Sequence, residues 1–95
     1  MCKAENEAMD LLVKAIVAIE SEEECRRFLD DLMTKKEVLD IAQRILVAKL
    51  LSEQVVYTKI TSETGASTAT ISRVKRSCEY GTGGYSSILT KIQED

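Results

Sequence analysis

The chain has 95 residues and a formal net charge of −3, and its composition is that of a helical protein. It has no Pro, Trp or His, one Phe and four Gly, while Leu, Ile, Val, Ala, Glu and Lys dominate. A chain of this length fills one core, so we expect a single domain over residues 1–95. No apolar run approaches the ~20 residues that span a bilayer, and no signal-like segment opens the chain, so we expect a cytoplasmic protein without membrane contact.

The three cysteines, Cys2, Cys25 and Cys78, lie far apart and form no CxxC pair. Since the chain has no histidine to complete a zinc site, we expect reduced thiols and no metal. The missing histidines, together with the absence of a nucleophile motif, also argue against an enzyme.

Although the net charge is negative, the chain contains a local basic segment. Residues 1–54 carry eight Lys or Arg against twelve Asp or Glu, whereas residues 55–95 carry five against four. Arg73, Lys75 and Arg76 lie together, and no acid occurs between Thr64 and Cys78. Because distribution matters more than net charge for nucleic-acid binding, this segment keeps DNA among the expected partners.

Helical periodicity begins near the N-terminus. Residues from Asn6 to Glu20 predict a first helix with one apolar face, made of Met9, Leu12, Val13, Ile16 and Ile19. Ser21 with Glu24 has the pattern of a capping box, which predicts a second helix from Glu22 to Met33. The inward positions of this second helix are Cys25, Phe28, Leu29 and Leu32.

Thr34 with Glu37 repeats the capping pattern and predicts a third helix from Lys35 to Glu53. This helix is apolar nearly all round. Its apolar residues are Val38, Leu39, Ile41, Ala42, Ile45, Leu46, Val47, Ala48, Leu50 and Leu51. Such a helix must be covered on more than one side, and this short chain has few other helices to cover it. We therefore expect a homodimer that shares the third helix.

The segment Tyr57–Arg76 fits two short helices joined by a tight turn. Ile60 faces inward from the first of these helices, and Ile71 and Val74, one turn apart on the second, face back onto it. Gly65 lies at the reversal, where a left-handed backbone is cheap only for glycine. This spacing predicts a helix-turn-helix over about residues 57–76.

The second motif helix begins after Ser67, a good N-cap, and turns small and basic side chains outward. These are Thr68, Ala69, Ser72, Arg73, Lys75 and Arg76, with Thr70 beside them. A helix that enters the major groove needs short side chains at its start, near the bases, and cations where it meets phosphates. The motif therefore predicts binding to double-stranded DNA. The alternative is a dimeric protein-interaction module whose motif reads no DNA, and the clustered basic residues argue against it.

Three glycines, at positions 81, 83 and 84, interrupt the pattern after the motif. They do not form a phosphate loop, because no strand precedes them and no GK[ST] follows. Tyr85, Ile88, Leu89 and Ile92 then predict a short last helix.

From Phe28 to Gly81 the sequence resembles the Trp-repressor superfamily, and GASTATISRVKRSCEYGTGGY is similar to its YerC/YecD-type branch. The resemblance covers more than half the chain, including the Met33–Thr34 start of the third helix, Arg44 and the whole motif. It implies an all-α, Trp-repressor-like fold in an intertwined homodimer, and a sequence-specific transcriptional regulator that acts as a repressor.

The resemblance also implies roles for individual residues in DNA binding. Tyr57, Thr58 and Thr61 would lie nearest the phosphate backbone. Thr70 would contact phosphate. The residues that would approach the bases are Ser67, Thr68, Ala69 and Ser72.

In members that bind tryptophan, two arginines hold the indole ring between them, and Arg44 and Arg73 match those positions. Met33, Thr34 and Thr70 fall near other positions of this effector pocket. Val74 stands where those repressors have glycine, and its methyl groups would fill the space of a flat ring. We therefore expect no tryptophan cofactor, and an effector, if there is one, that the sequence does not identify. In a simpler alternative, Arg44 pairs with Asp40 and Arg73 serves DNA phosphate.

Overall fold

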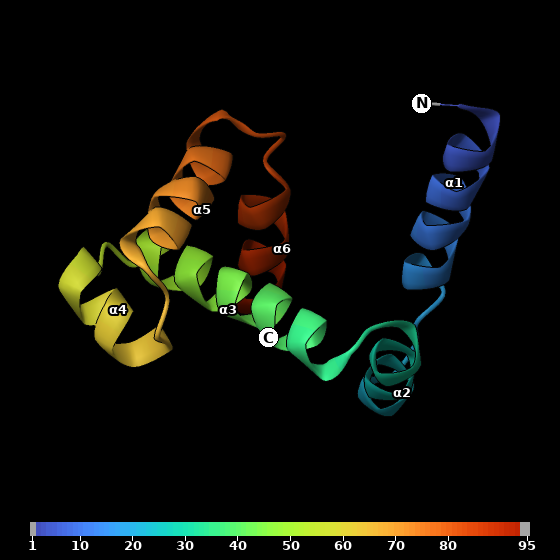
Figure 1. Ribbon diagram of the computed structural model, residues 1–95, viewed down its shortest axis with the longest axis horizontal. Helices are drawn as coiled ribbons and strands as arrows, with labels where there is room; N and C mark the ends of the chain where they lie inside the picture. Colours follow the sequence, from blue (N-terminus) through green and yellow to red (C-terminus); the bar gives the residue numbers. More distant parts are fainter. Residues whose placement is uncertain (1, 94–95) are drawn as a thin grey trace. The chain divides into compact units, whose positions relative to one another are not determined.

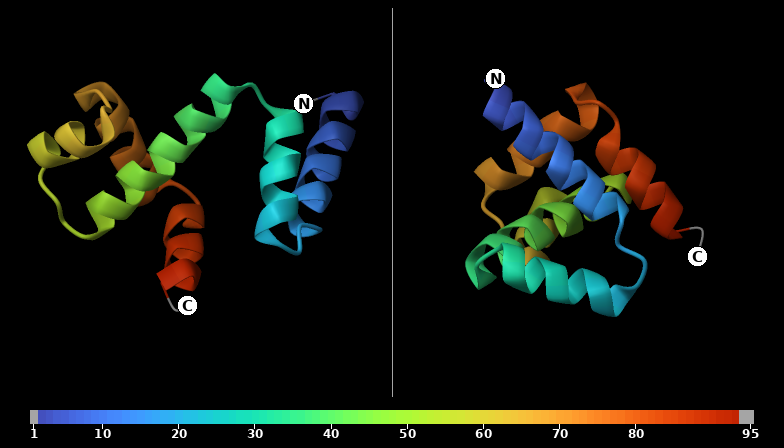
Figure 2. Two further views of the ribbon diagram at one scale, coloured as in Figure 1. Left: turned by 90° about the horizontal axis from the view of Figure 1, so that it is seen from below. Right: turned by 90° about the vertical axis from the view of Figure 1, so that its right-hand side faces the viewer.

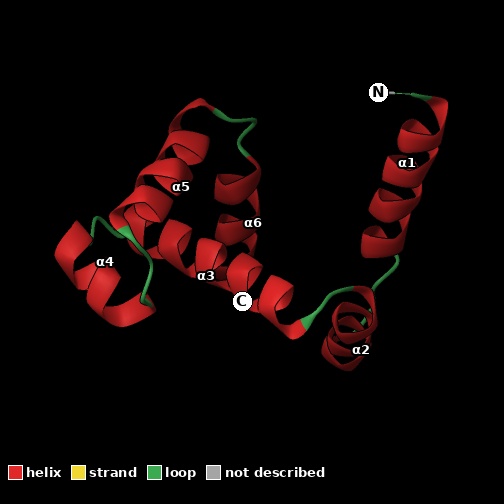
Figure 3. Ribbon diagram, viewed as in Figure 1, coloured by secondary structure: helices red, strands yellow, loops and turns green. Residues whose placement is uncertain are grey.

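The computed structural model describes residues 2–93, which form helices and loops and, within that range, no strand (Figures 1 and 3). The helices are α1 (Lys3–Val17), α2 (Glu22–Leu32), α3 (Lys35–Ser52), α4 (Tyr57–Thr64), α5 (Thr68–Tyr80) and α6 (Gly84–Gln93). The predicted all-α class is confirmed. Among the described residues, no helix combines the length and the apolar character needed to cross a membrane. The chain divides into two compact units, Met1–Lys35 and Lys36–Asp95.

In the first unit, α1 begins and ends three residues earlier than the periodicity indicated. Its first turn carries Glu5, whose charge favours the positive end of a helix. The apolar periodicity detects only the turns of a helix that carry apolar side chains. It therefore did not detect the polar first turn of α1. After Val17 the chain tightens, and the Ile19 N–H donates to the Ile16 carbonyl at 3.2 Å.

The predicted cap of α2 is present in a modified form. The Glu24 N–H donates to the Ser21 hydroxyl at 3.1 Å, as a capping box requires. The Glu24 carboxylate, however, accepts from the N–H of Glu20, one residue before the expected partner, at 3.0 Å. Both bonds still satisfy backbone donors at the start of the helix, so α2 begins where the sequence predicted.

The first unit buries none of its described residues. The predicted inward residues Cys25, Phe28 and Leu29 are half-buried, while Leu32 is exposed. On α1, Val17 keeps 77% of its surface exposed. A helical pair with this much open apolar surface has no core of its own.

In the second unit, α4, α5 and α6 gather around the C-terminal part of α3 (Figures 1 and 2). Each of these helices contributes to one core, as does the loop between α4 and α5. The buried residues of this core are Val47, Ala48, Leu50, Ile60, Ala66, Ile71, Val74 and Leu89. The motif helices are thus anchored on the long helix by apolar packing.

The end of α3 is a Schellman motif with glutamine in the place usually taken by glycine. Gln54 has φ 60, and its N–H donates to the Leu51 carbonyl at 3.0 Å. The Val55 N–H donates to the Leu50 carbonyl at 3.1 Å. These two bonds satisfy carbonyls at the helix end and stop the helix at Ser52, one residue before the predicted Glu53.

Part of the apolar surface of α3 is exposed within the chain. Leu39 is 57% exposed, and Ile41, Ile45 and Leu46 are exposed as well. The buried residues of α3 are confined to Val47, Ala48 and Leu50. The chain therefore leaves open one side of the helix that the sequence marked as apolar nearly all round.

Candidate nucleic-acid interface

The turn between α4 and α5 has the geometry that the sequence predicted. Gly65 adopts φ 75 and ψ 3, in the left-handed region. Its N–H donates to the Thr61 carbonyl at 2.9 Å, which closes the last turn of α4. No heavy atom would lie within 4 Å of a Cβ at Gly65, so the backbone conformation alone demands glycine here.

The side chain of Thr64 also stabilises this turn, and it was not identified in the sequence analysis. Its hydroxyl donates to the Ile60 carbonyl at 2.7 Å and accepts from the Ala66 N–H at 3.0 Å. A threonine at a helix end followed by glycine is the signal that could have indicated it. The two bonds bring Ala66 into the core, where it is buried.

Ser67 caps α5 as predicted. The Thr70 N–H donates to the Ser67 hydroxyl at 3.1 Å, and this hydroxyl in turn donates to that of Thr70, also at 3.1 Å. The cap sets the first residue of α5 at Thr68. Thr68 and Ala69 therefore occupy its first turn, and both are exposed.

The inner face of the motif is buried, as the spacing of its apolar residues indicated. Ile60 and Ile71 are fully buried and Val74 nearly so. This packing fixes which side of α5 faces outward, because residues three and four apart share a helix face.

On the outer side, Tyr57 of α4 and several α5 residues line an open groove of about 540 Å³. Four residues predicted to bind DNA converge there with Tyr57: Ser72, Arg73, Lys75 and Arg76. Glu79 and Tyr80 also line the groove and were not predicted. Tyr80 is 80% exposed and follows Arg76 by one helical turn, a spacing that could have placed it on this face.

Lys75 is held between two neighbours in the groove. Its ammonium lies 5.8 Å from the centroid of the Tyr57 ring and 3.8 Å from Glu79 Oε1. The cation–π contact contributes about 0.5 to 1 kcal/mol at an exposed site, and the half-exposed ion pair contributes little. Glu79 lies just outside the acid-free stretch of the sequence. It reaches Lys75 because the two residues are one helical turn apart.

The remaining predicted DNA-binding residues lie outside the groove. Thr58 and Thr61 are exposed on α4, as Thr68 and Ala69 are on α5. Ser67 and Thr70 form the cap, and Thr70 is half-buried. The structure therefore divides the predicted set into a basic groove, two exposed threonines of α4 and a polar surface at the start of α5.

Four of the six predicted effector-pocket residues also converge. Arg44, Thr70, Arg73 and Val74 line one hollow of about 310 Å³ in the second unit, together with Asp40, Gln43, Ser77 and Tyr85. Met33 and Thr34 belong to the first unit and are not part of this lining.

The alternative pairing of Arg44 with Asp40 is wrong. Asp40 Oδ2 pairs with Lys36 Nζ at 3.1 Å, one turn earlier on α3. Lys36 and Arg44 both lie one turn from Asp40 on α3. Asp40 pairs with the earlier of the two, and Arg44 lines the hollow that it shares with Arg73.

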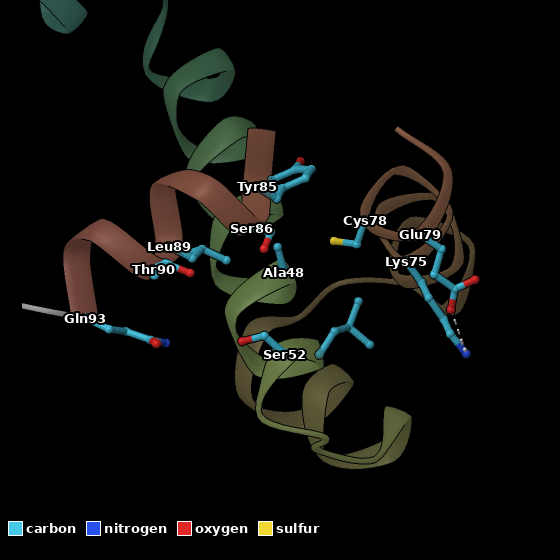
Figure 4. Close-up of a pocket in the computed structure, with 11 residues that line it drawn as sticks. Ala48, Ser52, Lys75, Cys78, Glu79, Tyr85, Ser86, Leu89, Thr90 and Gln93 are labelled. Atoms are coloured by element: carbon cyan, nitrogen blue, oxygen red, sulfur yellow. Dashed lines mark ion pairs between the residues drawn. The ribbon is translucent and has the colours of Figure 1, made fainter. Parts of the chain in front are cut away.

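A different cavity, of about 270 Å³, lies between α3, α5 and α6 (Figure 4). The Cys78 thiol points into it, opposite Ala48 and Leu89 (Figure 4). Burial, and to a lesser degree the nearby Glu79 carboxylate, raise the pKa of this thiol above its ordinary value. Of the predicted site residues, Lys75 reaches this cavity.

With the motif geometry established, comparison with known proteins decides the family. Residues 7–93 match the family described as Trp repressor protein. The chain belongs to the Trp repressor family. The predicted resemblance to this family and its YerC-type branch is thereby confirmed.

The chain is similar to other proteins of the Trp repressor kind over nearly its whole length. The uncharacterized protein YerC of Bacillus subtilis (strain 168) is 47% identical over 92 residues, which cover 97% of this chain and 88% of YerC. A crystal structure described as a candidate Trp repressor from Staphylococcus aureus has a TM-score of 0.88 and 42% identity, covering 100% of this chain and 98% of that one. A TrpR-like protein from Eubacterium eligens ATCC 27750 has a TM-score of 0.88 and 41% identity, covering 92% and 90%.

Trp repressor family proteins are DNA-binding regulators and not enzymes. The family assignment therefore agrees with the functional class that the motif predicted.

Proposed function

We propose that this protein is a sequence-specific transcriptional regulator that binds double-stranded DNA as a homodimer and represses the genes whose operators it occupies. One observation carries the proposal. The α4–α5 motif buries Ile60, Ile71 and Val74 and turns Arg73, Lys75 and Arg76 outward. This division of faces suits a helix that lies in the major groove with its cations beside the phosphates.

Within this proposal, the residues of the motif have separate tasks. Thr68, Ala69 and Ser72 approach base edges, because short side chains let the helix start come close. Arg73, Lys75 and Arg76 contact phosphates, as do Tyr57, Thr58 and Thr61 of α4 and Thr70. Ser67 caps α5 and lies beside the bases. The cation–π contact of Lys75 with Tyr57 keeps one phosphate-binding cation near α4.

The homodimer is supported by apolar surface that the single chain cannot cover. The first unit buries none of its described residues, and α3 leaves Leu39, Ile41, Ile45 and Leu46 exposed. A second copy supplies matching apolar surface, so we propose that the two units of each chain form one domain by interlocking with a partner. Two motifs related by a two-fold axis would then read half-sites about 34 Å apart.

Selection of bound sequences from a random pool of DNA duplexes tests this function. We expect a roughly palindromic consensus with half-site centres about 10 base pairs apart. Arg73→Glu should abolish the selection, because it places a carboxylate against phosphate. The matched control is Lys91→Glu, the same charge reversal on an exposed residue of α6, which should select the same consensus. A pool without any common motif would instead favour the protein-interaction module.

A further inference from the structure

One hydrogen bond connects the long helix directly to the turn of the motif. Gln43 Nε2, on α3, donates to the backbone carbonyl of Thr64, the last residue of α4, at 3.1 Å. The two residues are 21 positions apart in the chain, and the bond is partly buried. Gln43 therefore contacts the motif beside the glycine that reverses the chain.

The other side-chain hydrogen bonds of the motif are local. Those of Thr64 reach Ile60 and Ala66, and those of Ser67 reach Thr70. They shape the turn and the start of α5 from within. They do not connect the motif to α3.

Val47 and Ala48 of α3 share a core with Ile60 and Ile71. Side-chain packing between helices favours a limited set of crossing angles, with a scatter of about 15 to 20°. A hydrogen bond weakens steeply when its angle departs from linearity. The bond from Gln43 therefore adds a directional restraint to the crossing angle that the core favours.

We propose that Gln43 is a positioning residue that sets the tilt of the helix-turn-helix on α3, and thereby the half-site spacing that the dimer accepts. The proposal rests on the proposed function, because spacing has meaning only for a dimer that reads two half-sites. Thr64 directly precedes Gly65, and α5 starts four residues after Thr64. A 13-residue helix is roughly 20 Å long, so a tilt of about 10° displaces one end by roughly 3 Å. That displacement is close to the rise of one base pair.

The test measures affinity for a series of duplexes with the selected half-sites, separated by the selected spacing and by one base pair more or less. The wild-type dimer should prefer its own spacing by roughly tenfold or more. Gln43→Met, which keeps the length of the side chain and removes the donor, should reduce this preference to about threefold or less. The bases preferred within each half-site should stay the same.

Two further variants separate positioning from general stability. Gln43→Glu retains the size and polarity but sets an acceptor against the Thr64 carbonyl, so it should also weaken the spacing preference. Leu89→Val trims a buried side chain of α6 and leaves the bond intact. It should lower the melting temperature and keep the wild-type spacing preference.

The two proposals fail in different ways. If the wild-type protein selects a palindrome, and both Gln43→Met and Gln43→Glu keep its spacing preference, the positioning role is overturned and the function stands. If the wild-type protein selects no common sequence, the proposed function is overturned, and the positioning role with it.

Discussion

Lys75 Nζ lies over the ring of Tyr57, 5.8 Å from its centroid, and this contact joins α5 to α4 on the outer side of the motif. The same ammonium lies 3.8 Å from the Glu79 carboxylate. Core packing behind the motif and this contact in front of it hold the two helices from both sides. The contact lies in the groove that also gathers Arg73 and Arg76.

The first prediction separates phosphate contact from base reading on α5. Arg76→Ala should weaken binding to all sequences alike and reduce the salt dependence by about one counterion, because one phosphate contact is lost. Thr68→Ala should instead change the preferred base at one position, by about 1 to 3 kcal/mol. Fluorescence anisotropy with selected and scrambled duplexes, over a range of salt concentrations, measures both effects. Equal weakening of all sequences by Thr68→Ala would contradict the reading role.

The second prediction concerns assembly. Sedimentation equilibrium at micromolar concentration should give twice the chain mass of 10.6 kDa. Leu39→Glu should shift this equilibrium to the monomer, because a charge at an exposed apolar position of α3 is costly only when a partner covers it. Ser62→Glu is the matched control, since it adds the same charge at an exposed polar position of α4. A stable wild-type monomer would refute the shared helix.

The third prediction is that tryptophan is not the co-regulator. Val74 is almost fully buried and lines the hollow that Arg44 and Arg73 share. Placing an indole against its methyl groups costs about 1 to 3 kcal/mol, or roughly ten- to a hundredfold in affinity. Titration calorimetry with tryptophan should show no saturable binding to the wild-type protein.

Two variants test the role of Val74 in excluding the indole. Val74→Gly opens the most space, and Val74→Ala opens less but keeps a good helix former. Both should gain affinity for tryptophan and lose stability, by roughly 2 kcal/mol for Val74→Ala. Tight binding of tryptophan to the wild-type protein, together with stronger DNA binding, would show that the hollow accepts the ring as it is.

The fourth prediction compares two glycines. Gly65→Ala should lower the free energy of unfolding by about 1 to 2 kcal/mol, because φ is 75 there and a Cβ disfavours that region. Gly84 begins α6 with an ordinary φ, and a Cβ there would meet Thr82 Oγ1 at 3.9 Å. Gly84→Ala should therefore leave stability unchanged or raise it slightly. Urea denaturation at one fixed protein concentration compares them, and a neutral Gly65→Ala would contradict the left-handed turn.

The fifth prediction follows from the raised pKa of the Cys78 thiol. A higher pKa means less thiolate at each pH below it, and the thiolate is the reactive form. In a Cys2→Ser, Cys25→Ser background, Cys78 should react with iodoacetamide more slowly than a small free thiol at neutral pH. The reaction rate of Cys78 should rise at a higher pH than that of the free thiol. Glu79→Gln should speed the reaction modestly, because burial, the larger cause, remains; a rate profile that matches the free thiol would contradict the shift.

Local interactions made much of this protein predictable from its sequence. Gly65 at the reversal and the Ser67 cap depend on residues no more than four apart, and the structure confirms both. The buried side of the motif follows from the helical repeat, so Ile60, Ile71 and Val74 were also found correctly. The outer groove then followed as the opposite side of the same helix.

Tertiary structure alone decided the features that depend on distant or competing partners. The bond from Gln43 to Thr64 spans 21 residues, and no sequence period relates the two positions. Arg44 and Arg73 line one hollow because of how α3 packs beside α5. In the sequence analysis these two residues were paired only through the resemblance to the family. Asp40 had Lys36 and Arg44 within equal reach, and only the folded geometry selected Lys36. Side-chain spacing along a helix constrains which residues share a face, whereas contacts between helices depend on packing that the period of one helix does not encode.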